Sequence, residues 1–344
     1  MVNEAKLERE IERFAQALGN ASRILITAPA FADGDSVGTQ LALRYLFLRQ
    51  FPQLKVTILN DLPLPPRYQF MPGAYDIHTP ESLFESNQDI SFDLGIVVDG
   101  GIDRAGRVRE YYDRCRVKVF VDHHVISCDY PYDIRLVEPE ATSTTELIYH
   151  LVQKNPFCCT MTSELAQDIY LGLVFDTGFF RHSNTTPESM ELGAKLLRAG
   201  FDFTQVGERG MLERTFPGLQ LLSDTLGRSR LIADGKIIWS ILTQDKLREL
   251  NASDDDREGI IDQMVLTQGI DVAILFYELP KGETRLSLRS HGGLDVATFA
   301  RGLTIHGGGH RKAAGANLQM PVALAIDWVL EKLIEEVKRC GVHS

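Results

Sequence analysis

The amino-acid sequence predicts an α/β protein in which a doubly wound parallel sheet is followed by a smaller α/β domain. In the first half, apolar runs rich in β-branched residues alternate with helical periods. Each run is continuous, which indicates strands buried on both faces, as in a parallel sheet covered by helices. The chain has 344 residues, more than the roughly 250–300 at which one hydrophobic core stops growing. We therefore expect two domains.

Strands and helices alternate along the first half. The charged, amphipathic start of the chain, 1–20, predicts a helix and lacks the pattern of a signal peptide. Continuous apolar runs predict strands at 23–29, 55–60, 93–99 and 117–124. Helical periods predict helices at 36–50, 142–154 and 163–175. We expect residues 1–190 to form the first domain.

The second half reads as a hinge followed by a smaller domain. Residues 191–229 are helical in pattern and more charged, and we interpret them as a linker. Beyond them, strands are predicted at 236–243, 271–279 and 284–290. The segment GLTIHGGGHRKAAGA then carries five glycines in fifteen residues, and a terminal helix runs from Pro321 to about Arg339. We expect 230–344 to form the second domain, with a cleft between the domains.

Charge and cysteine content exclude several classes of protein. There are 36 basic and 47 acidic residues, a net charge of −11, which disfavours binding to long duplex DNA. The five cysteines are an odd number without a C-x-x-C pair, so neither a disulfide framework nor a zinc ribbon is expected. Apolar runs stay shorter than the roughly 18–20 residues of a membrane span. We expect a cytoplasmic protein.

Acidic residues and histidines fall at the predicted strand ends: Asp33 and Asp35 after the first strand, Asp99 after the third, Asp122, His123 and His124 after the fourth, and Asp176 at a helix end. The carboxyl ends of parallel strands share one edge, where open α/β folds build their sites. Taken singly, such residues also serve as helix caps or turn formers. Together, carboxylates and imidazoles at one edge indicate a site for Mn²⁺, Mg²⁺ or Fe²⁺.

Five segments resemble the motifs of the DHH phosphoesterase family and its associated C-terminal domain, in the family's order. They are ADGDSVGTQ (32–40), VVDGGIDRAGR (97–107), VFVDHHVI (119–126), GLVFDTGFFRHSN (172–184) and GGGHRKAAGA (307–316). The resemblance covers nearly the whole chain. Because the chain lacks room for further domains, it is similar to the compact nanoRNase and pAp-phosphatase members rather than to the long RecJ exonucleases.

The resemblance implies a centre of two metal ions, with Mn²⁺ as the expected cation. Asp33 and Asp35 would each ligate one metal, Asp99 would bridge both, and His123 and Asp176 would bind the second. Asp122 would orient its neighbours, and His124 would lie near the scissile phosphate. The family's first motif usually begins with His where this chain has Pro29. Water or another residue such as His182 would then complete the first metal site, or the metal would bind more weakly.

The second domain is expected to hold the substrate. Glycines such as Gly308 and Gly309 allow the backbone to approach a phosphate closely, although they also suit a tight turn under a helix. His310, Arg311 and Arg289 would supply donors to a terminal phosphate. Arg181, beside the fourth metal motif, is a further candidate, although an ordinary surface arginine is equally consistent with its position.

The expected activity is hydrolysis of very short oligonucleotides to nucleoside 5′-monophosphates by a metal-dependent phosphodiesterase. Linear dinucleotides such as pGpG and pApA, together with pAp, are the expected substrates. Two alternatives stay open: a cyclic dinucleotide phosphodiesterase, and a catalytically weak sensor that binds a dinucleotide. The resemblance also allows a homodimer.

Overall fold

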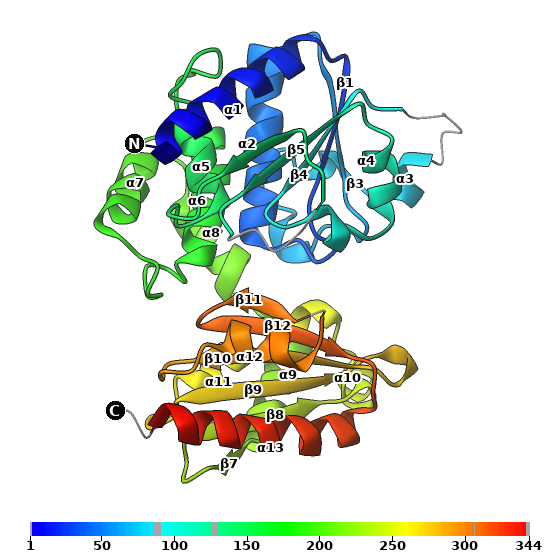
Figure 1. The fold of residues 1–344 in the computed structure, drawn as a ribbon, viewed down its shortest axis with the longest axis vertical. Helices are drawn as coiled ribbons and strands as arrows, with labels where there is room; N and C mark the ends of the chain where they lie inside the picture. Colours follow the sequence, from blue (N-terminus) through cyan, green and yellow to red (C-terminus); the bar gives the residue numbers. More distant parts are fainter. Residues whose placement is uncertain (1, 85–90, 125–129, 306, 342–344) are drawn as a thin grey trace. The chain divides into compact units, whose positions relative to one another are not determined.

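A computed structural model describes residues 2–84, 91–124, 130–305 and 307–341, except for the side chains of 2–5, 84, 281, 310, 340 and 341 (Figure 1). The chain divides into two compact units, Met1–Glu213 and Arg214–Ser344. We call these the N-terminal and C-terminal units and describe each by itself. The boundary between them falls inside the segment 191–229.

The sheet of the N-terminal unit has six parallel strands in the order β3-β2-β1-β4-β5-β6. The strands are β1 Arg23–Thr27, β2 Lys55–Leu59, β3 Ile77–His78, β4 Leu94–Val98, β5 Val117–Asp122 and β6 Ile134–Val137. The order reverses between the neighbours β1 and β4. Sites in open parallel sheets form at this reversal, beyond the carboxyl ends of the strands. The prediction of a doubly wound parallel sheet is confirmed.

Helices cover both faces of this sheet (Figure 1). One face packs against α1 Val2–Gly19, α2 Gly34–Gln50, α5 Thr144–Leu151 and α6 Ser163–Asp176. The other packs against the short α4 Arg109–Asp113 and the 3₁₀ turns Ile102–Arg104 and Gly106–Val108, with α3 Pro80–Phe84 nearby. Ile24 and Ile26 of β1 belong to the first core, and Leu25 to the second. Consecutive residues are thus buried on opposite faces, as the continuous apolar runs predicted.

Helices α2 and α6 approach each other closely, because glycine stands at their contact points. A Cβ on Gly38 of α2 would lie 2.4 Å from the carbonyl oxygen of Asp168. A Cβ on Gly172 of α6 would lie 2.3 Å from Oδ1 of Asp35. The carboxyl end of α6 is therefore held directly against the start of α2. The N-terminal unit ends with α7 Pro187–Leu197, α8 Phe203–Gly207 and a π-helical turn, Glu208–Leu212.

The C-terminal unit contains a mixed sheet in the order β11-β12-β10-β9-β8-β7, in which only β8 and β9 pair in parallel. Its strands are β7 Arg230–Ile232, β8 Ile237–Leu242, β9 Val272–Glu278, β10 Thr284–Ser290, β11 Gly308–His310 and β12 Ala313–Leu318. Its helices are α9 Phe216–Gly227, α10 Gln244–Leu250, α11 Ile260–Val265, α12 Val296–Leu303 and α13 Val322–Gly341. The first three pack on one face of the sheet and the last two on the other.

The glycine-rich segment forms part of this sheet, although the sequence analysis predicted no strand there. Residues of β11 and β12 pair as an antiparallel hairpin, with Gly308 opposite Gly315. Small residues had hidden the strand pattern, since glycine and alanine carry little β propensity. Among the described residues, the helices are all too short or too polar to cross a bilayer.

Candidate metal centre

The first motif begins the helix that follows β1. Asp33 caps α2: its Oδ1 accepts hydrogen bonds from the backbone N–H groups of Asp35 (3.1 Å) and Ser36 (3.0 Å). Capping by a carboxylate satisfies N–H groups that have no partner within the helix. Asp33 is only partly buried, whereas Asp35, in the first turn, is fully buried.

Asp35 is held by two other helices. Its Oδ2 accepts a hydrogen bond of 2.7 Å from the backbone N–H of Thr144, and its Oδ1 one of 3.0 Å from that of Thr145. Both N–H groups lie in the first turn of α5, which Ser143 caps. On the other side, Gly172 of α6 leaves the space that the carboxylate occupies. The orientation of Asp35 is therefore fixed from two sides.

Asp99 follows β4 in a left-handed backbone conformation, with φ of 53°. Aspartate tolerates this conformation better than most residues. Its Oδ2 accepts a hydrogen bond of 2.6 Å from the hydroxyl of Ser36, and its Oδ1 one of 3.3 Å from that of Thr144. Asp99 is thereby tied to both α2 and α5.

His123, just beyond β5, brings its ring between two carboxylates. Its Nδ1 donates to the carbonyl oxygen of Ala141 at 3.2 Å, so Nε2 faces the acids. Nε2 lies 3.1 Å from Oδ2 of Asp176 and 4.0 Å from Oδ2 of Asp35. A carbonyl that fixes Nδ1–H and leaves Nε2 for a cation is the usual arrangement of a metal-binding histidine.

His124 is oriented by Asp122 at the end of β5. Its Nδ1 donates to Oδ1 of Asp122 at 2.6 Å, and its backbone N–H donates to the same oxygen at 3.0 Å. Nδ1 also lies 3.8 Å from Oδ1 of Asp99. The His124 side chain is 30% exposed, whereas that of Asp122 is buried. The last residues of the third motif, Val125 and Ile126, lie outside the described residues.

Two overlapping groups of side chains could each hold a metal ion. Within each group, one ligand atom from every residue lies within 4.8 Å of the others. The first comprises Asp99, Asp122, His123 and His124, and the second Asp35, His123 and Asp176. The structure thus brings together six of the seven residues predicted at strand and helix ends. Asp33 belongs to neither group, although its charge acts on Asp35, Asp99 and Asp176.

Electrostatics favours a cation at this position. Burial, followed by the charges of Asp33 and Asp35, raises the pKa of Asp99 well above its usual range. Burial and the charge of Asp35 raise the pKa of Asp176 to about 7, although His123 opposes this. Buried carboxylates that repel one another are stabilised by a cation between them. Oxygen donors with an imidazole fit Mn²⁺, Mg²⁺ or Fe²⁺.

In the two histidine–aspartate pairs, the partner residue opposes the effect of burial on the pKa and outweighs it. Burial alone would lower the pKa of His123, but Asp176 and Asp35 outweigh it and raise the value to about 10. Burial alone would raise the pKa of Asp122, but the hydrogen bonds from His124 lower it. Asp122 therefore stays ionised and accepts from His124.

Two side chains of the segment after Asp176 contact its backbone carbonyl. The carbonyl oxygen of Asp176 lies 2.9 Å from Nδ1 of His182 and accepts a hydrogen bond of 3.2 Å from the amide of Asn184. Arg181 is exposed, and its Nε donates to the carbonyl oxygen of Gly178 at 2.7 Å. Pro29 is buried against the turn that follows Asp99, where a Cβ on Gly100 would lie 2.7 Å from its Cγ.

The residues expected to bind substrate lie in the C-terminal unit, apart from Arg181. Arg289 of β10 donates from Nε to Oδ1 of Asp262 in α11 at 2.7 Å, and its side chain is 27% exposed. A Cβ on Gly308 would meet open space, whereas one on Gly309 would lie 2.5 Å from the carbonyl oxygen of Ala313. Arg311 is exposed, and the side chain of His310 lies outside the described part. Gly309 is therefore needed for the hairpin itself, whereas the described residues leave the position of a Cβ on Gly308 unoccupied.

Sequence reasoning missed the residues that support the carboxylates, namely Ser36, Thr144 and Thr145. A signal existed for the last two: Ser143 and Glu146 have the spacing of a helix N-terminal cap. That pattern predicts free N–H groups at the start of α5, which Asp35 accepts. Ser36 carried no comparable signal.

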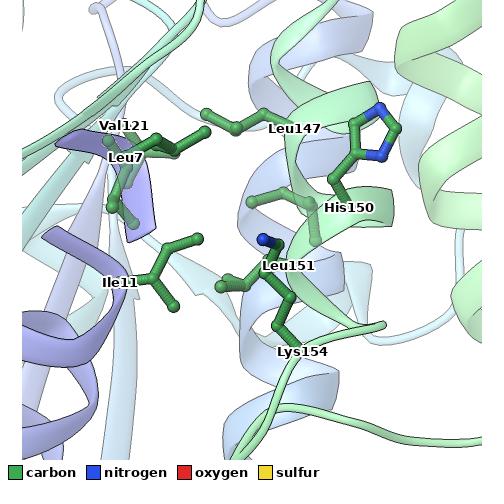
Figure 2. A pocket seen from close by; sticks show the side chains of 9 residues that line it. Leu7, Ile11, Val121, Leu147, His150, Leu151 and Lys154 are labelled. Atoms are coloured by element: carbon green, nitrogen blue, oxygen red, sulfur yellow. The ribbon is translucent and has the colours of Figure 1, made fainter. Parts of the chain in front are cut away.

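A small apolar cavity lies elsewhere in the N-terminal unit, between α1 and α5 (Figure 2). Its volume is about 20 Å³, and its lining includes Leu7, Ile11, Val121 and Leu147. His150 and Lys154 stand at its edge. Its lining is apolar and offers few hydrogen-bond partners to a water molecule. It contains none of the candidate ligand side chains and is a packing defect beside β5.

Comparisons with known proteins agree with this geometry. The model of the DHH family, N-terminal domain, matches residues 23–173, and that of the DHHA1 domain matches 234–339. The chain is 25% identical over 328 residues to the bifunctional oligoribonuclease and PAP phosphatase NrnA of Thermus thermophilus, covering 92% of this chain and 91% of that protein. It is 26% identical over 299 residues to the probable NrnA of Streptococcus mutans, covering 83% and 86%.

Solved structures share the fold. An exopolyphosphatase-related protein from Bacteroides fragilis superposes with a TM-score of 0.84 at 23% identity, over 96% of this chain and 97% of its own. Exonuclease RecJ bound to manganese superposes with a TM-score of 0.51 at 15% identity, over 96% and 94%. With both domain models matched in order, the chain belongs to the DHH family of phosphoesterases, which are hydrolases.

Proposed function

We propose that this protein is a metal-dependent phosphodiesterase that hydrolyses very short oligonucleotides to nucleoside 5′-monophosphates. The observation that carries the proposal is the pair of overlapping Asp and His groups at the switch point between β1 and β4. The names of two relatives that cover most of the chain, oligoribonuclease and PAP phosphatase, support the substrate class. Linear dinucleotides such as pGpG and pApA, and also pAp, are the proposed substrates.

The chain's own residues would divide the work. Asp35, Asp99, His123 and Asp176 would hold divalent cations, with Mn²⁺ proposed first, and Asp33 would complete the set. Such cations compensate the phosphate charge and lower the pKa of a bound water. Asp122 orients the ring of His124 through Nδ1, and we propose that Nε2 contacts a phosphate oxygen.

Residues outside the centre would grip the rest of the substrate. Arg289 would bind a terminal phosphate, with its Nε held by Asp262. Gly308, Gly309, His310 and Arg311 of the C-terminal unit, and Arg181 of the N-terminal unit, are further proposed substrate contacts. A short substrate agrees with the net charge of −11, which repels long nucleic acids. We also propose a cytoplasmic location and leave a homodimer as an expectation.

Product analysis by chromatography tests this proposal. The protein, loaded with Mn²⁺, is incubated with pGpG, pAp and a cyclic dinucleotide, and Asp99→Asn serves as the inactive control. Conversion of pGpG to GMP with the cyclic compound spared supports the proposal. If the cyclic compound disappears first, the protein is a cyclic dinucleotide phosphodiesterase. Tight nucleotide binding without turnover would identify a sensor.

A further inference from the structure

Three consecutive residues after Asp176 adopt a left-handed backbone. The φ angles of Gly178, Phe179 and Phe180 are 54°, 59° and 60°. Glycine adopts this conformation freely, but two bulky side chains in succession make it strained. Strained backbone persists only where its surroundings hold it, and it is concentrated at functional sites.

Each phenylalanine ring is seated on a glycine of a following helix. A Cβ on Gly193 of α7 would lie 2.9 Å from Cζ of Phe180. A Cβ on Gly207 of α8 would lie 3.0 Å from Cε1 of Phe179. Both rings pack against the large core that also contains the sheet. The two helices therefore determine where the rings lie, and a side chain at either glycine would displace one of them.

Hydrogen bonds connect the backbone of the two phenylalanines to the end of α6, where Asp176 is the last residue. The backbone N–H of Phe179 donates to the carbonyl oxygen of Val174 at 2.9 Å. That of Phe180 donates to Oγ1 of the fully buried Thr177 at 3.1 Å. The hydroxyl of Thr177 itself donates to the carbonyl oxygen of Leu173 at 2.7 Å. Displacing either ring would therefore shift the turn and the last residues of α6.

We propose that Phe179 and Phe180 are positioning residues for Asp176. The contacts of their rings with Gly207 and Gly193 fix the backbone turn, and the turn fixes the position of the Asp176 carboxylate relative to His123. The inference rests on the proposed function, because it takes Asp176 to be a metal ligand. It assigns no contact with metal or substrate to either ring. The 3.1 Å between Oδ2 of Asp176 and Nε2 of His123 is the distance that the turn controls.

Gly193→Ala tests the seat of Phe180. The added Cβ forces the ring to move, and we expect the dissociation constant for Mn²⁺, measured by isothermal titration calorimetry, to rise about tenfold or more, as when a support of a metal ligand is lost. The Mn²⁺ concentration for half-maximal activity should rise in parallel, with the KM for pGpG unchanged. Gly19→Ala, at the end of α1 with open space around the new Cβ, is the matched control and should bind Mn²⁺ like the wild type.

A double variant separates positioning from a general loss of structure. Leucine lacks the Cζ atom that the new Cβ would meet, so Gly193→Ala should cost much less Mn²⁺ affinity in a Phe180→Leu background than in the wild type. Additive losses in the two backgrounds would overturn the proposal, as would unchanged affinity in Gly193→Ala. If Gly193→Ala does not fold, judged by circular dichroism, the milder Gly207→Ala decides in its place.

The metal assignment has its own control. Asp176→Asn should weaken Mn²⁺ binding whatever the role of the turn. If it binds Mn²⁺ like the wild type, the ligand assignment and this inference both fail. If Asp176→Asn weakens binding while both glycine variants bind normally, only the positioning role fails and the proposed function stands.

Discussion

The hydroxyl of Ser36 donates a hydrogen bond of 2.6 Å to Oδ2 of Asp99, which joins the segments that follow β1 and β4. Both side chains are buried, and Thr144 adds a hydrogen bond of 3.3 Å to the other carboxylate oxygen. These two strands are the neighbours between which the strand order reverses. Two hydroxyl groups from different helices thus hold Asp99 at the position where a bridging metal ligand is expected.

Ser36→Ala should weaken metal binding more than it weakens the fold. Removing one hydrogen bond to a metal ligand typically lowers metal affinity about 10–100-fold. The same loss should cost about 1 kcal/mol of unfolding free energy. Calorimetric titration with Mn²⁺ and a urea melt measure the two effects. The exposed Ser223→Ala in α9 is the control, and equal Mn²⁺ affinity in the two variants would remove Ser36 from the site.

Asp99→Asn should abolish turnover while preserving the fold. Asparagine tolerates the left-handed backbone at φ of 53° and still accepts the hydrogen bond from Ser36, so only the charge is lost. We expect kcat for pGpG to fall by more than about 100-fold, beyond the usual effect of losing a partner of a metal ligand. The melting temperature of the metal-free protein should not fall, because a repelling buried charge is gone. Near wild-type kcat would refute the bridging role.

Arg289→Ala should raise KM far more than it lowers kcat. A contact to a distant phosphate acts equally in the ground state and the transition state, so its loss weakens binding alone. Asp262→Ala should raise KM by less, because it frees Arg289 without removing it. Arg301→Ala, exposed on α12, is the control. A fall in kcat with unchanged KM would argue against Arg289 as a phosphate ligand.

Pro29→His should lower the Mn²⁺ concentration needed for half-maximal activity. Family members usually carry histidine here, whereas this chain packs a proline ring against Gly100, beside Asp99. An added imidazole would supply a nitrogen donor to the centre. Activity measured across a Mn²⁺ titration compares the variant with wild type. An unchanged midpoint would mean that the site is already complete without this nitrogen.

The elements best predicted from sequence were those with long, strongly apolar or periodic patterns. The strand predicted at 117–124 is β5 Val117–Asp122, and the helix predicted at 163–175 is α6 Ser163–Asp176. Local pattern did not reveal β3 Ile77–His78, which has only two residues, or the hairpin of β11 and β12. Those strands form by hydrogen bonding to neighbouring strands of the sheet, and a short window of sequence does not show which neighbours are available.

The candidate site likewise contains residues that the sequence predicted and residues that it did not. Acids at strand ends could be located because parallel strands share an edge, and six of the seven residues do converge. The spacing of Ser143 and Glu146 indicated the start of α5, but not that its N–H groups support Asp35, because Thr144 and Thr145 lie more than a hundred residues away from that carboxylate. The left-handed turn at Phe179 was equally hidden, because the sequence there suggests only buried aromatic residues.

Asp168 should make the protein less stable as the pH rises. It lies in α6 with its side chain 1% exposed, and its Oδ1 has no hydrogen-bond partner among the described residues. Burial, with a contribution from Glu164, raises its pKa well above 3.8, although Arg44 opposes this. The folded state thus binds the proton more tightly than the unfolded state. Stability from this group is full below about pH 4 and is lost as the pH rises toward the folded-state pKa.

Asp168→Asn keeps the shape of the side chain and removes the ionisation. We expect it to unfold with a larger free energy than the wild type at pH 8, by about 1.4 kcal/mol for each unit by which the pKa is raised. The gain should shrink as the pH falls and vanish near pH 4. Urea melts of both proteins at pH 8, 6 and 4 measure it, with the exposed Asp327→Asn in α13 as control. A gain equal at all pH values would assign the effect to packing, and a loss at pH 8 would mean that Arg44 stabilises the charged form.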